Sequence, residues 1–256
     1  MRSLANKRAI ITGGSRGIGL AIARLFASEG TSVTLVGRDE ARLSSALDSL
    51  SAGEQQHHHQ PPARHNSYAF DVSSIDGWTG MLNDMKQTQQ NVDILVNAAG
   101  ITQQSLLYKS DPAENQRIIN TNLMGTIFGC QSVSQQMIRQ KSGCIVNISS
   151  LLAVQGGLGA SVYAASKAGI VGLTRSFALE VGRFGVRVNV LLPGYIQTDM
   201  TKPIHVAMDE KGNLSASIPL RRLGTAEEVA DAAAFLVKNP YAHNAVLNLD
   251  GGLSAT

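Results

Sequence analysis

The fold is decided by the stretch "RAIITGGSRGIGLAIARLF" (residues 8–26). An apolar run of strand length leads into a glycine-rich turn, and the turn opens an amphipathic helical pattern. The glycines allow a tight turn, close approach of the backbone to a ligand and close helix–strand packing, and the free N–H groups of the helix attract phosphate. The unit therefore predicts a dinucleotide site in an α/β fold. Its predicted members are Gly13, Ser15, Arg16, Gly17, Ile18 and Gly19.

Further apolar runs of strand length follow this unit, and helical patterns separate them. Such alternation predicts a Rossmann-type, doubly wound α/β fold, in which a seven-stranded parallel sheet carries helices on both faces. We predict a single domain over residues 1–256, with a low-complexity insert at about 53–66 and a substrate loop at about 195–218. The predicted strands are "RAIIT" (8–12), "SVTLV" (32–36), "SYAFD" (67–71), "VDILVN" (92–97), "GCIVNIS" (143–149), "VRVNVLL" (186–192) and "AVLNLD" (245–250).

The composition is that of a globular protein with a sizeable core, because hydrophobic residues make up 43% and charged residues 16% of the chain. A net charge of +3 without a block of Lys and Arg argues against nucleic-acid binding. No run reaches the roughly 18 apolar residues of a membrane span. We expect neither a signal peptide nor a cleaved presequence, because the first strand begins by about residue 8.

The cysteines and histidines do not form a metal motif. Cys130 and Cys144 lie in apolar contexts, and we expect both thiols to be buried. The insert contains His57–His59, and neighbouring side chains in a regular element cannot all point one way. We therefore interpret the insert as a solvated loop.

Capping motifs in the sequence predict where two of the helices begin. In "SDPAENQ" (110–116), Asp111 is a predicted cap, Pro112 fits the first turn, and Glu114 is predicted to complete a capping box. In "GTAEEVADAAAFL" (224–236), Thr225 and Glu228 are predicted to form the same motif.

The end of the second predicted strand indicates which dinucleotide binds. An NAD site usually places a carboxylate there to bind the ribose hydroxyls, but this chain has Gly37 followed by Arg38. Arg16 lies in the glycine turn, and two guanidinium groups suit the 2′-phosphate of NADP. We expect Asp39 to begin the next helix instead of binding the ribose. The sequence therefore favours NADP(H) over NAD.

Tyr163 and Lys167 lie four residues apart within "SVYAASKAGI" (161–170), so a helix would place them on one face. The neighbouring side chains are small and leave room for a ligand. An ammonium group near a phenol favours the phenolate and is expected to lower its pKa from about 10. A tyrosine tuned in this way can exchange a proton with a carbonyl or alcohol oxygen.

Other polar residues and turns are expected at the same edge of the sheet. Ser150 follows the fifth strand, where its hydroxyl can donate to a substrate oxygen. Asn122 lies inside a helical pattern despite its poor helix propensity, which suggests a functional role such as holding a water against Lys167. Residues expected to line the nicotinamide side are Asn97, Gly100, Pro193, Gly194 and Thr198.

In this order and spacing, the motifs resemble the short-chain dehydrogenase/reductase family over nearly the whole chain. The matching features are "TGGSRGIG" (12–19), "FDV" (70–72), "NAAG" (97–100), Asn122, Ser150, Tyr163, Lys167 and "PG" (193–194) followed by Thr198. The resemblance implies that Tyr163 is the general acid/base, that Lys167 lowers its pKa and binds the nicotinamide ribose, and that Ser150 orients the substrate carbonyl. Asn122 would complete a proton relay. The resemblance adds Asp71, Val72 and Ile196 to the cofactor site.

The chain departs from the family pattern at two places. The usual second Asn of "NNAG" is Ala98, which leaves Asn97 as the residue assigned to the cofactor. The usual "TG" before the last strand is replaced by "HNA" (243–245), a change that affects a turn beside an expected subunit interface.

Within the family, the chain most resembles 3-oxoacyl-acyl-carrier-protein reductases, including the mitochondrial carbonyl reductase type. This implies NADPH-dependent reduction of a 3-oxoacyl thioester in fatty acid synthesis. It also implies acyl carrier protein as partner, which would dock on basic residues beside the entrance. A position that is usually Arg in these reductases is Phe184. The candidate docking residues are Arg139, Lys141, Arg175 and Arg183.

Other interpretations remain open from the sequence. One is a broad carbonyl or quinone reductase, or a hydroxysteroid or polyol dehydrogenase, because the substrate loop is not readable. Another is a non-catalytic NADPH-binding subunit of a hetero-oligomer, against which the intact Ser150, Tyr163 and Lys167 argue. The resemblance implies a homotetramer or related hetero-oligomer through helices around 112–140 and 161–182. The expected location is the mitochondrial matrix or the cytoplasm.

Overall fold

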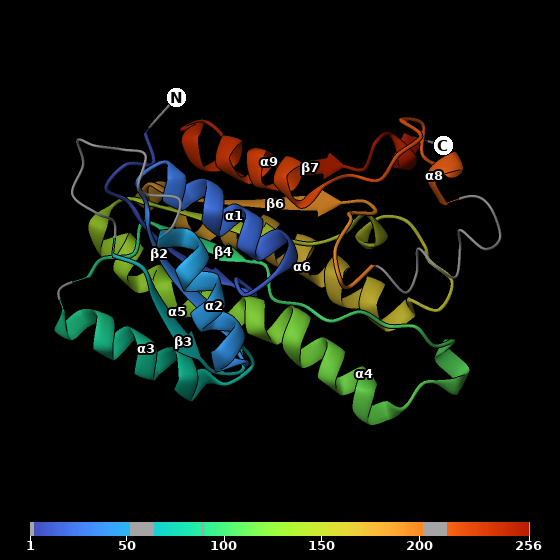
Figure 1. Ribbon diagram of the computed structural model, residues 1–256, viewed down its shortest axis with the longest axis horizontal. Helices are drawn as coiled ribbons and strands as arrows, with labels where there is room; N and C mark the ends of the chain where they lie inside the picture. The colour runs from blue at the N-terminus through green and yellow to red at the C-terminus, as the bar shows by residue number, and fades with distance from the viewer. Residues whose placement is uncertain (1–2, 52–63, 89, 202–213, 256) are drawn as a thin grey trace.

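One sheet of seven parallel strands is the centre of the molecule (Figure 1). The computed structural model describes residues 3–51, 64–88, 90–201 and 214–255. The strand order is β3-β2-β1-β4-β5-β6-β7, which confirms the predicted fold class. The strands are β1 Arg8–Thr12, β2 Ser32–Gly37, β3 Asn66–Ala69, β4 Ile94–Asn97, β5 Gly143–Ile148, β6 Val186–Pro193 and β7 Val246–Leu249.

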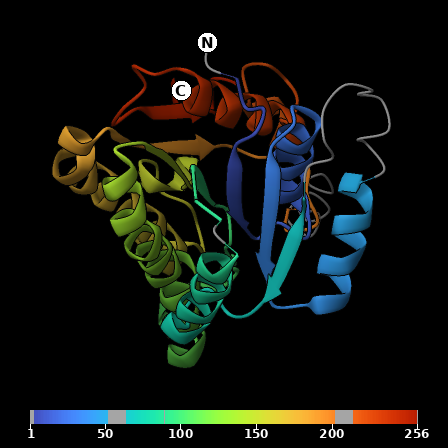
Figure 2. The ribbon, with the colours of Figure 1, turned by 90° about the vertical axis from the view of Figure 1, so that its left-hand side faces the viewer.

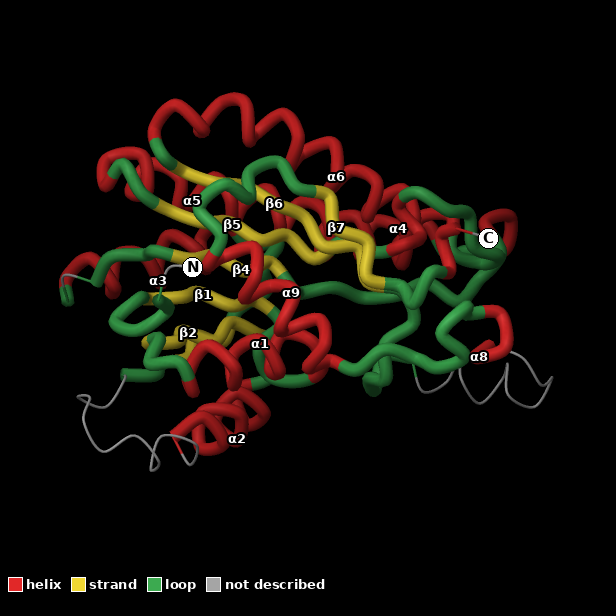
Figure 3. Tube along the Cα trace, turned by 90° about the horizontal axis from the view of Figure 1, so that it is seen from above, coloured by secondary structure: helices red, strands yellow, loops and turns green. Residues whose placement is uncertain are grey.

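Helices cover both faces of the sheet (Figures 2 and 3). Helices α1, α2 and α9 lie on one face, and α3, α4, α5 and α6 lie on the other. The α-helices are α1 Gly17–Ser28, α2 Glu40–Ser51, α3 Ile75–Gln87, α4 Pro112–Ile119, α5 Gly125–Gln140, α6 Ser161–Val181, α8 Leu214–Ser217 and α9 Ala226–Lys238. A π-helical segment, η3 Asn120–Met124, joins α4 to α5, and the 3₁₀ turns are η2 Leu107–Lys109, η4 Leu151–Ala153, η5 Gly182–Phe184 and η6 Leu253–Ala255.

The core has a layer on each face of the sheet. Apolar side chains of α1 and α9 pack on one face, and those of α3, α5 and α6 pack on the other. The central strands are buried on both faces, which is why their sequences are nearly continuous apolar runs. In the part of the chain that the structure describes, no helix has both the length and the hydropathy to span a bilayer.

The strand order reverses between β1 and β4. Chain segments leave these neighbouring strands in opposite directions along the sheet, so a crevice opens beyond their carboxyl ends. Ligands of doubly wound folds bind at this point. The fold therefore directs attention to the loops that follow β1, β2 and β4.

The two predicted helix starts have different outcomes. The Thr225 hydroxyl accepts from the Glu228 N–H, and the Glu228 carboxylate accepts from the Thr225 N–H, so the capping box of α9 is confirmed. Asp111 caps α4 as predicted. The predicted role of Glu114 is wrong, because its carboxylate pairs with Arg117 on the next turn at 2.8 Å.

The predicted insert and substrate loop are described only in part. Residues 52–63, which include His57–His59, and residues 202–213 lie outside the described residues. The turn that replaces "TG" is described, and Asn244 there has a φ of 55°. The His243 ring accepts from the Val188 N–H and bonds the Ala178 carbonyl, so this turn ties β6 to α6.

Candidate active site

A cavity of about 180 Å³ lies at the carboxyl ends of β1, β2 and β4. It collects residues from the glycine turn, the end of β2, the segment after β3, the loop after β4 and the segment after β6, which lie far apart in the sequence. The predicted residues that line it are Gly13, Ser15, Arg16, Gly17, Ile18, Gly19, Arg38, Asp71, Val72, Gly100 and Thr198.

The glycine turn fits a phosphate group. Gly13 has a φ of +65°, and a Cβ there would lie 2.8 Å from the Ala98 carbonyl oxygen. A Cβ on Gly19 would lie 2.4 Å from the Gly13 oxygen, so the helix start can approach the turn only without a side chain. Arg16 precedes α1 and provides no side-chain cap, which leaves the first N–H groups of the helix available.

Two arginines mark one end of this cavity. Arg16 and Arg38 are both exposed and both line it. Burial tends to raise the pKa of Asp71, but hydrogen bonds from Ser73 and the Arg38 charge outweigh burial and lower the pKa. Asp39 accepts from the Arg42 N–H at 3.0 Å and begins α2 as expected. Its carboxylate is therefore occupied by the helix start, and the guanidinium groups set the charge at this end.

Tyr163, Lys167 and Ser150 meet beside the other end of the cavity. Lys167 is 5% exposed, and its Nζ lies 5.7 Å from the centre of the Tyr163 ring. The Ser150 side chain lies near the Tyr163 hydroxyl and acts to lower its pKa. A Cβ on the cavity residue Gly100 would lie 3.4 Å from the Lys167 Nζ, so a ligand in the cavity has direct access to this cluster.

The electrostatics of this cluster differ from expectation. Burial raises the pKa of Tyr163 above its usual value, and the Ser150 side chain only partly opposes the rise. The expected lowering of the Tyr163 pKa by Lys167 is wrong, because burial raises this pKa instead. The Lys167 ammonium group donates to the Ile148 carbonyl at 2.9 Å. Burial also lowers the pKa of Lys167 to about 8. Tyr163 thus holds its proton at neutral pH and is poised to donate it.

Asn122 lies in the π-helical segment, where the long helical pattern is interrupted. Its side chain is fully buried, accepts from the Ile101 N–H at 2.8 Å and donates to the Ile101 carbonyl and the Ser166 hydroxyl, both at 3.0 Å. A Cβ on Gly100 would lie 3.4 Å from its Oδ1. Asn122 therefore adjoins the cluster and fastens the loop after β4 to α6, while its proton-relay role stays a prediction.

Besides Tyr163 and Lys167, which lie beside the cavity, four predicted cofactor residues do not line it. The Asn97 side chain points into the core, where it donates to Asn147 at 2.9 Å. Ile196 is 4% exposed and packs in the core below α1 and α9. Pro193 ends β6, and the Gly194 N–H donates to the Leu249 carbonyl of β7. The side chains of Asn97 and Ile196 thus lie in the core, and the contribution of all four residues to the cofactor site stays a prediction.

Several lining residues were not assigned to the site from the sequence. They include Phe70, Ala99, Ile101, Thr121 and Met200. Phe70 and Ala99 lie within the matched stretches "FDV" and "NAAG", and most of the five supply small or apolar surface. Gln103, on the loop after β4, adjoins the Tyr163 cluster and was also not singled out.

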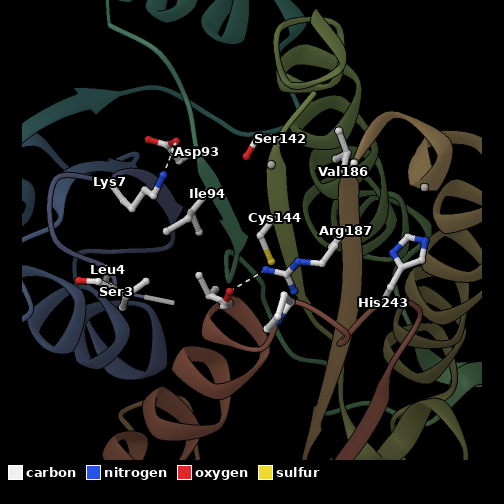
Figure 4. A pocket seen from close by; sticks show the side chains of 15 residues that line it. Ser3, Leu4, Lys7, Asp93, Ile94, Ser142, Cys144, Val186, Arg187 and His243 are labelled. Atoms are coloured by element: carbon white, nitrogen blue, oxygen red, sulfur yellow. Dashed lines mark hydrogen bonds and ion pairs between the residues drawn. The ribbon is translucent and has the colours of Figure 1, made fainter. Parts of the chain in front are cut away.

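A second cavity, of about 360 Å³, lies at the opposite edge of the sheet (Figure 4). Its charged groups are engaged with the chain itself: Lys7 pairs with Asp93 at 3.4 Å, and Arg187 donates to backbone carbonyls near the end of α9. The His243 ring also bonds the backbone on both nitrogens. This cavity offers no comparable cluster for chemistry.

The candidate docking residues do not lie beside the first cavity of the same chain. Arg139 and Lys141 precede β5, and Arg183 precedes β6, so all three lie where the strands begin. The six residues of β5 span about 20 Å between the two edges. Arg175 is exposed on α6, between the edges. Within one chain these four residues therefore form no basic patch beside the cavity, and their role in docking stays a prediction.

The comparisons with known proteins agree with this geometry. The family model described as short chain dehydrogenase matches residues 7–209. A 3-oxoacyl-acyl-carrier-protein reductase, FabG, of Chlamydia trachomatis serovar D is 40% identical over 255 residues, which cover 98% of each chain. A 3-oxoacyl-acyl-carrier-protein reductase of Bos taurus is 37% identical over 251 residues, covering 98% of this chain and 99% of that protein.

Solved structures share the whole fold. A structure described as a candidate NAD(P)-dependent gluconate 5-dehydrogenase from Beutenbergia cavernae, with NADP bound at low occupancy, has a TM-score of 0.91 at 32% identity and covers 99% of each chain. The family model, the full-length relatives and the arrangement of Ser150, Tyr163 and Lys167 agree. This chain belongs to the short-chain dehydrogenase family.

Proposed function

We propose that this chain reduces a 3-oxoacyl thioester, carried on acyl carrier protein, to the 3-hydroxyacyl thioester in fatty acid synthesis, with NADPH as reductant. The observation that carries the proposal is the cluster of Ser150, Tyr163 and Lys167 beside a glycine-lined cavity with two arginines at its far end. The full-length similarity to proteins named 3-oxoacyl-acyl-carrier-protein reductase supports the substrate class.

The residues present fit NADP(H). The glycine turn and the open start of α1 would hold the pyrophosphate, and Arg16 and Arg38 would bind the 2′-phosphate through charge-assisted hydrogen bonds. Asp71 and Val72 would border the adenine, and Thr198 would lie beside the nicotinamide. Pro193, Gly194 and Ile196 would contribute through the backbone.

When bound, NADPH supplies the hydride to the ketone carbon. Tyr163 protonates the ketone oxygen, and its raised pKa keeps it protonated until then. The Ser150 hydroxyl donates a hydrogen bond to the same oxygen and fixes its position. Lys167 holds its ammonium group beside the phenol, where it stabilises the phenolate that remains after proton transfer.

The test is NADPH oxidation with an acetoacetyl thioester, run beside NADH and a small quinone. Replacing Tyr163 with Phe should reduce kcat by about a thousandfold and leave the Kd for NADPH within about twofold, because only the proton donor is lost. The exposed Tyr108→Phe is the matched control. Retained turnover in Tyr163→Phe would refute the mechanism, and activity confined to the quinone would favour a broad carbonyl or quinone reductase.

We also propose that carrier protein docks on Arg139, Lys141, Arg175 and Arg183, and that assembly brings these residues to the cleft of another copy. Three of them lie at the strand-start edge, so they can flank a cleft only across an interface between copies. The proposed assembly is a homotetramer or a related hetero-oligomer. Charge reversal at Arg139, Lys141 and Arg183 should raise KM for the carrier-bound thioester and not for the coenzyme A thioester. Fractionation would decide between the mitochondrial matrix and the cytoplasm as location.

A further inference from the structure

Helix α6 carries the proposed proton donor, but it begins without a cap of its own. Its first turn presents N–H groups that have no partner within the helix, and Ala160 at the cap position has no side-chain acceptor. Helices α3, α4 and α9 are capped by a Ser, an Asp and a Thr from the adjoining chain. The start of α6 therefore needs an acceptor from elsewhere.

Gln103, on the loop after β4, supplies this acceptor. Its Oε1 accepts from the Val162 N–H at 2.8 Å and from the Tyr163 N–H at 3.2 Å. Its Nε2 donates to the Ser105 carbonyl at 3.2 Å, and the residue is only 6% exposed. One side-chain oxygen from a distant loop thus holds the backbone of the catalytic tyrosine.

The loop that carries Gln103 is itself fixed. Asn122 bonds both the N–H and the carbonyl of Ile101, and it also donates to the Ser166 hydroxyl. Ser166 in turn donates to the Tyr163 carbonyl at 2.7 Å. The first turn of α6 is therefore held at its start by Gln103 and on its side by Asn122 and Ser166.

We propose that Gln103 is a positioning residue for the reaction, which sets the place of the Tyr163 hydroxyl by capping α6 from outside the helix. This inference rests on the proposed function of Tyr163. Loss of the cap releases the first turn, and small displacements of a reacting group lower the rate strongly. Gln103 is not among the residues that line the cofactor cavity, so its loss should lower kcat and leave the Kd for NADPH nearly unchanged.

The test compares four variants by steady-state kinetics, NADPH titration and thermal melting. Gln103→Leu removes the acceptor and should lower kcat about tenfold or more, with KM and the Kd for NADPH within about twofold of wild type. Gln103→Glu keeps an acceptor oxygen at the same distance from the backbone and should retain most of kcat. Gln103→Asn is one methylene too short and should behave like Leu. The neighbouring Gln104 is exposed, so Gln104→Leu is the matched control and should match wild type.

The outcomes separate this inference from the function on which it rests. Wild-type kcat in a folded Gln103→Leu or Gln103→Asn would overturn it, as would a folded Gln103→Glu as slow as Leu. Tyr163→Phe is measured in parallel. If Tyr163→Phe is inactive and the Gln103 variants are normal, only the positioning role fails, whereas an active Tyr163→Phe overturns the proposed function itself.

Discussion

Two cations at opposite edges of the sheet, Lys167 and Arg187, are treated differently by the fold. Lys167 is 5% exposed and donates to one carbonyl, that of Ile148. Arg187 donates to three carbonyls at and beyond the end of α9, where the helix dipole favours a positive charge. The Arg187 guanidinium is thus engaged in hydrogen bonds to the backbone, whereas the Lys167 ammonium group retains N–H donors that can bind a ligand.

The same contrast separates the two cavities. At the carboxyl edge, glycines and an uncapped helix start leave backbone groups available to a ligand. At the opposite edge, the charged and ring groups of the cavity bond their own chain. A binding site is therefore recognised by hydrogen-bonding groups that the chain itself does not use. Of these two cavities, the larger one has groups that serve the structure of the chain.

The largest expected effect concerns the cost of burying Lys167. Burial lowers its pKa from 10.5 to about 8, so between these pH values the unfolded chain holds a proton that the folded chain has released. Between pH 8 and 10.5 the free energy of unfolding of the wild type should therefore rise by up to about 3 kcal/mol relative to that of Lys167→Met. Below pH 8 the Met variant should be the more stable by a constant amount. Denaturant unfolding at several pH values measures this difference.

A matched control for this experiment is Lys141→Met, which removes an exposed ammonium group. Its pH profile should run parallel to that of wild type. Parallel profiles for Lys167→Met as well would show that the buried ammonium group carries no such cost, and the contrast with Arg187 would be lost.

The fold could be predicted from the sequence because its signals are local. Apolar runs gave all seven strands, and the glycine turn gave the phosphate cradle and most of the cavity lining. The inward orientation of Asn97 and Ile196 was not predictable from motif spacing, because it depends on which face of a strand or turn the core covers. The prediction that Glu114 completes a capping box was wrong because its carboxylate pairs with Arg117 instead.

The site held two further surprises that depend on three-dimensional arrangement. Gln103 caps a helix 60 residues away in the chain. No local sequence pattern predicts so distant a capping residue. The docking residues were expected beside the entrance from the resemblance to carrier-protein reductases, and position along the chain does not tell at which edge of the sheet a residue lies. Only the parallel strand directions show that Arg139 and Arg183 lie at the strand-start edge.

At the ligand-binding edge, Arg38 is expected to set the preference for NADPH over NADH. Arg38→Ala should lower the preference for NADPH over NADH about thirtyfold, since a charge-assisted hydrogen bond to phosphate contributes about 2 kcal/mol. The change should lie in the KM for NADPH. Arg42→Ala, on the first turn of α2 and paired with Asp39, is the control. An unchanged cofactor preference would remove Arg38 from the site.

A smaller effect is expected from Arg187→Met at the other edge. The variant removes one donor from each of three carbonyls. The Ala242 carbonyl keeps the Asn189 amide as donor at 3.0 Å, and Val237 borders a cavity that water can enter, so the free energy of unfolding should fall by only about 1 kcal/mol. The values of kcat and KM should stay those of wild type. A specific loss of turnover in a folded variant would contradict the structural role of this edge.

The smallest expected effect is in the labelling of Cys144, which lines the cavity at the strand-start edge and is 3% exposed. Burial raises the pKa of Cys144 to about 11, so the reactive thiolate is scarce at pH 8. Iodoacetamide should leave the native chain unmodified and label both cysteines after unfolding, as followed by intact mass. The 2% exposed Cys130, inside the core, is the internal control. Rapid labelling of Cys144 alone in the native chain would mean that this cavity opens to small molecules and holds an available nucleophile, and the comparison between the two edges would fail at that residue.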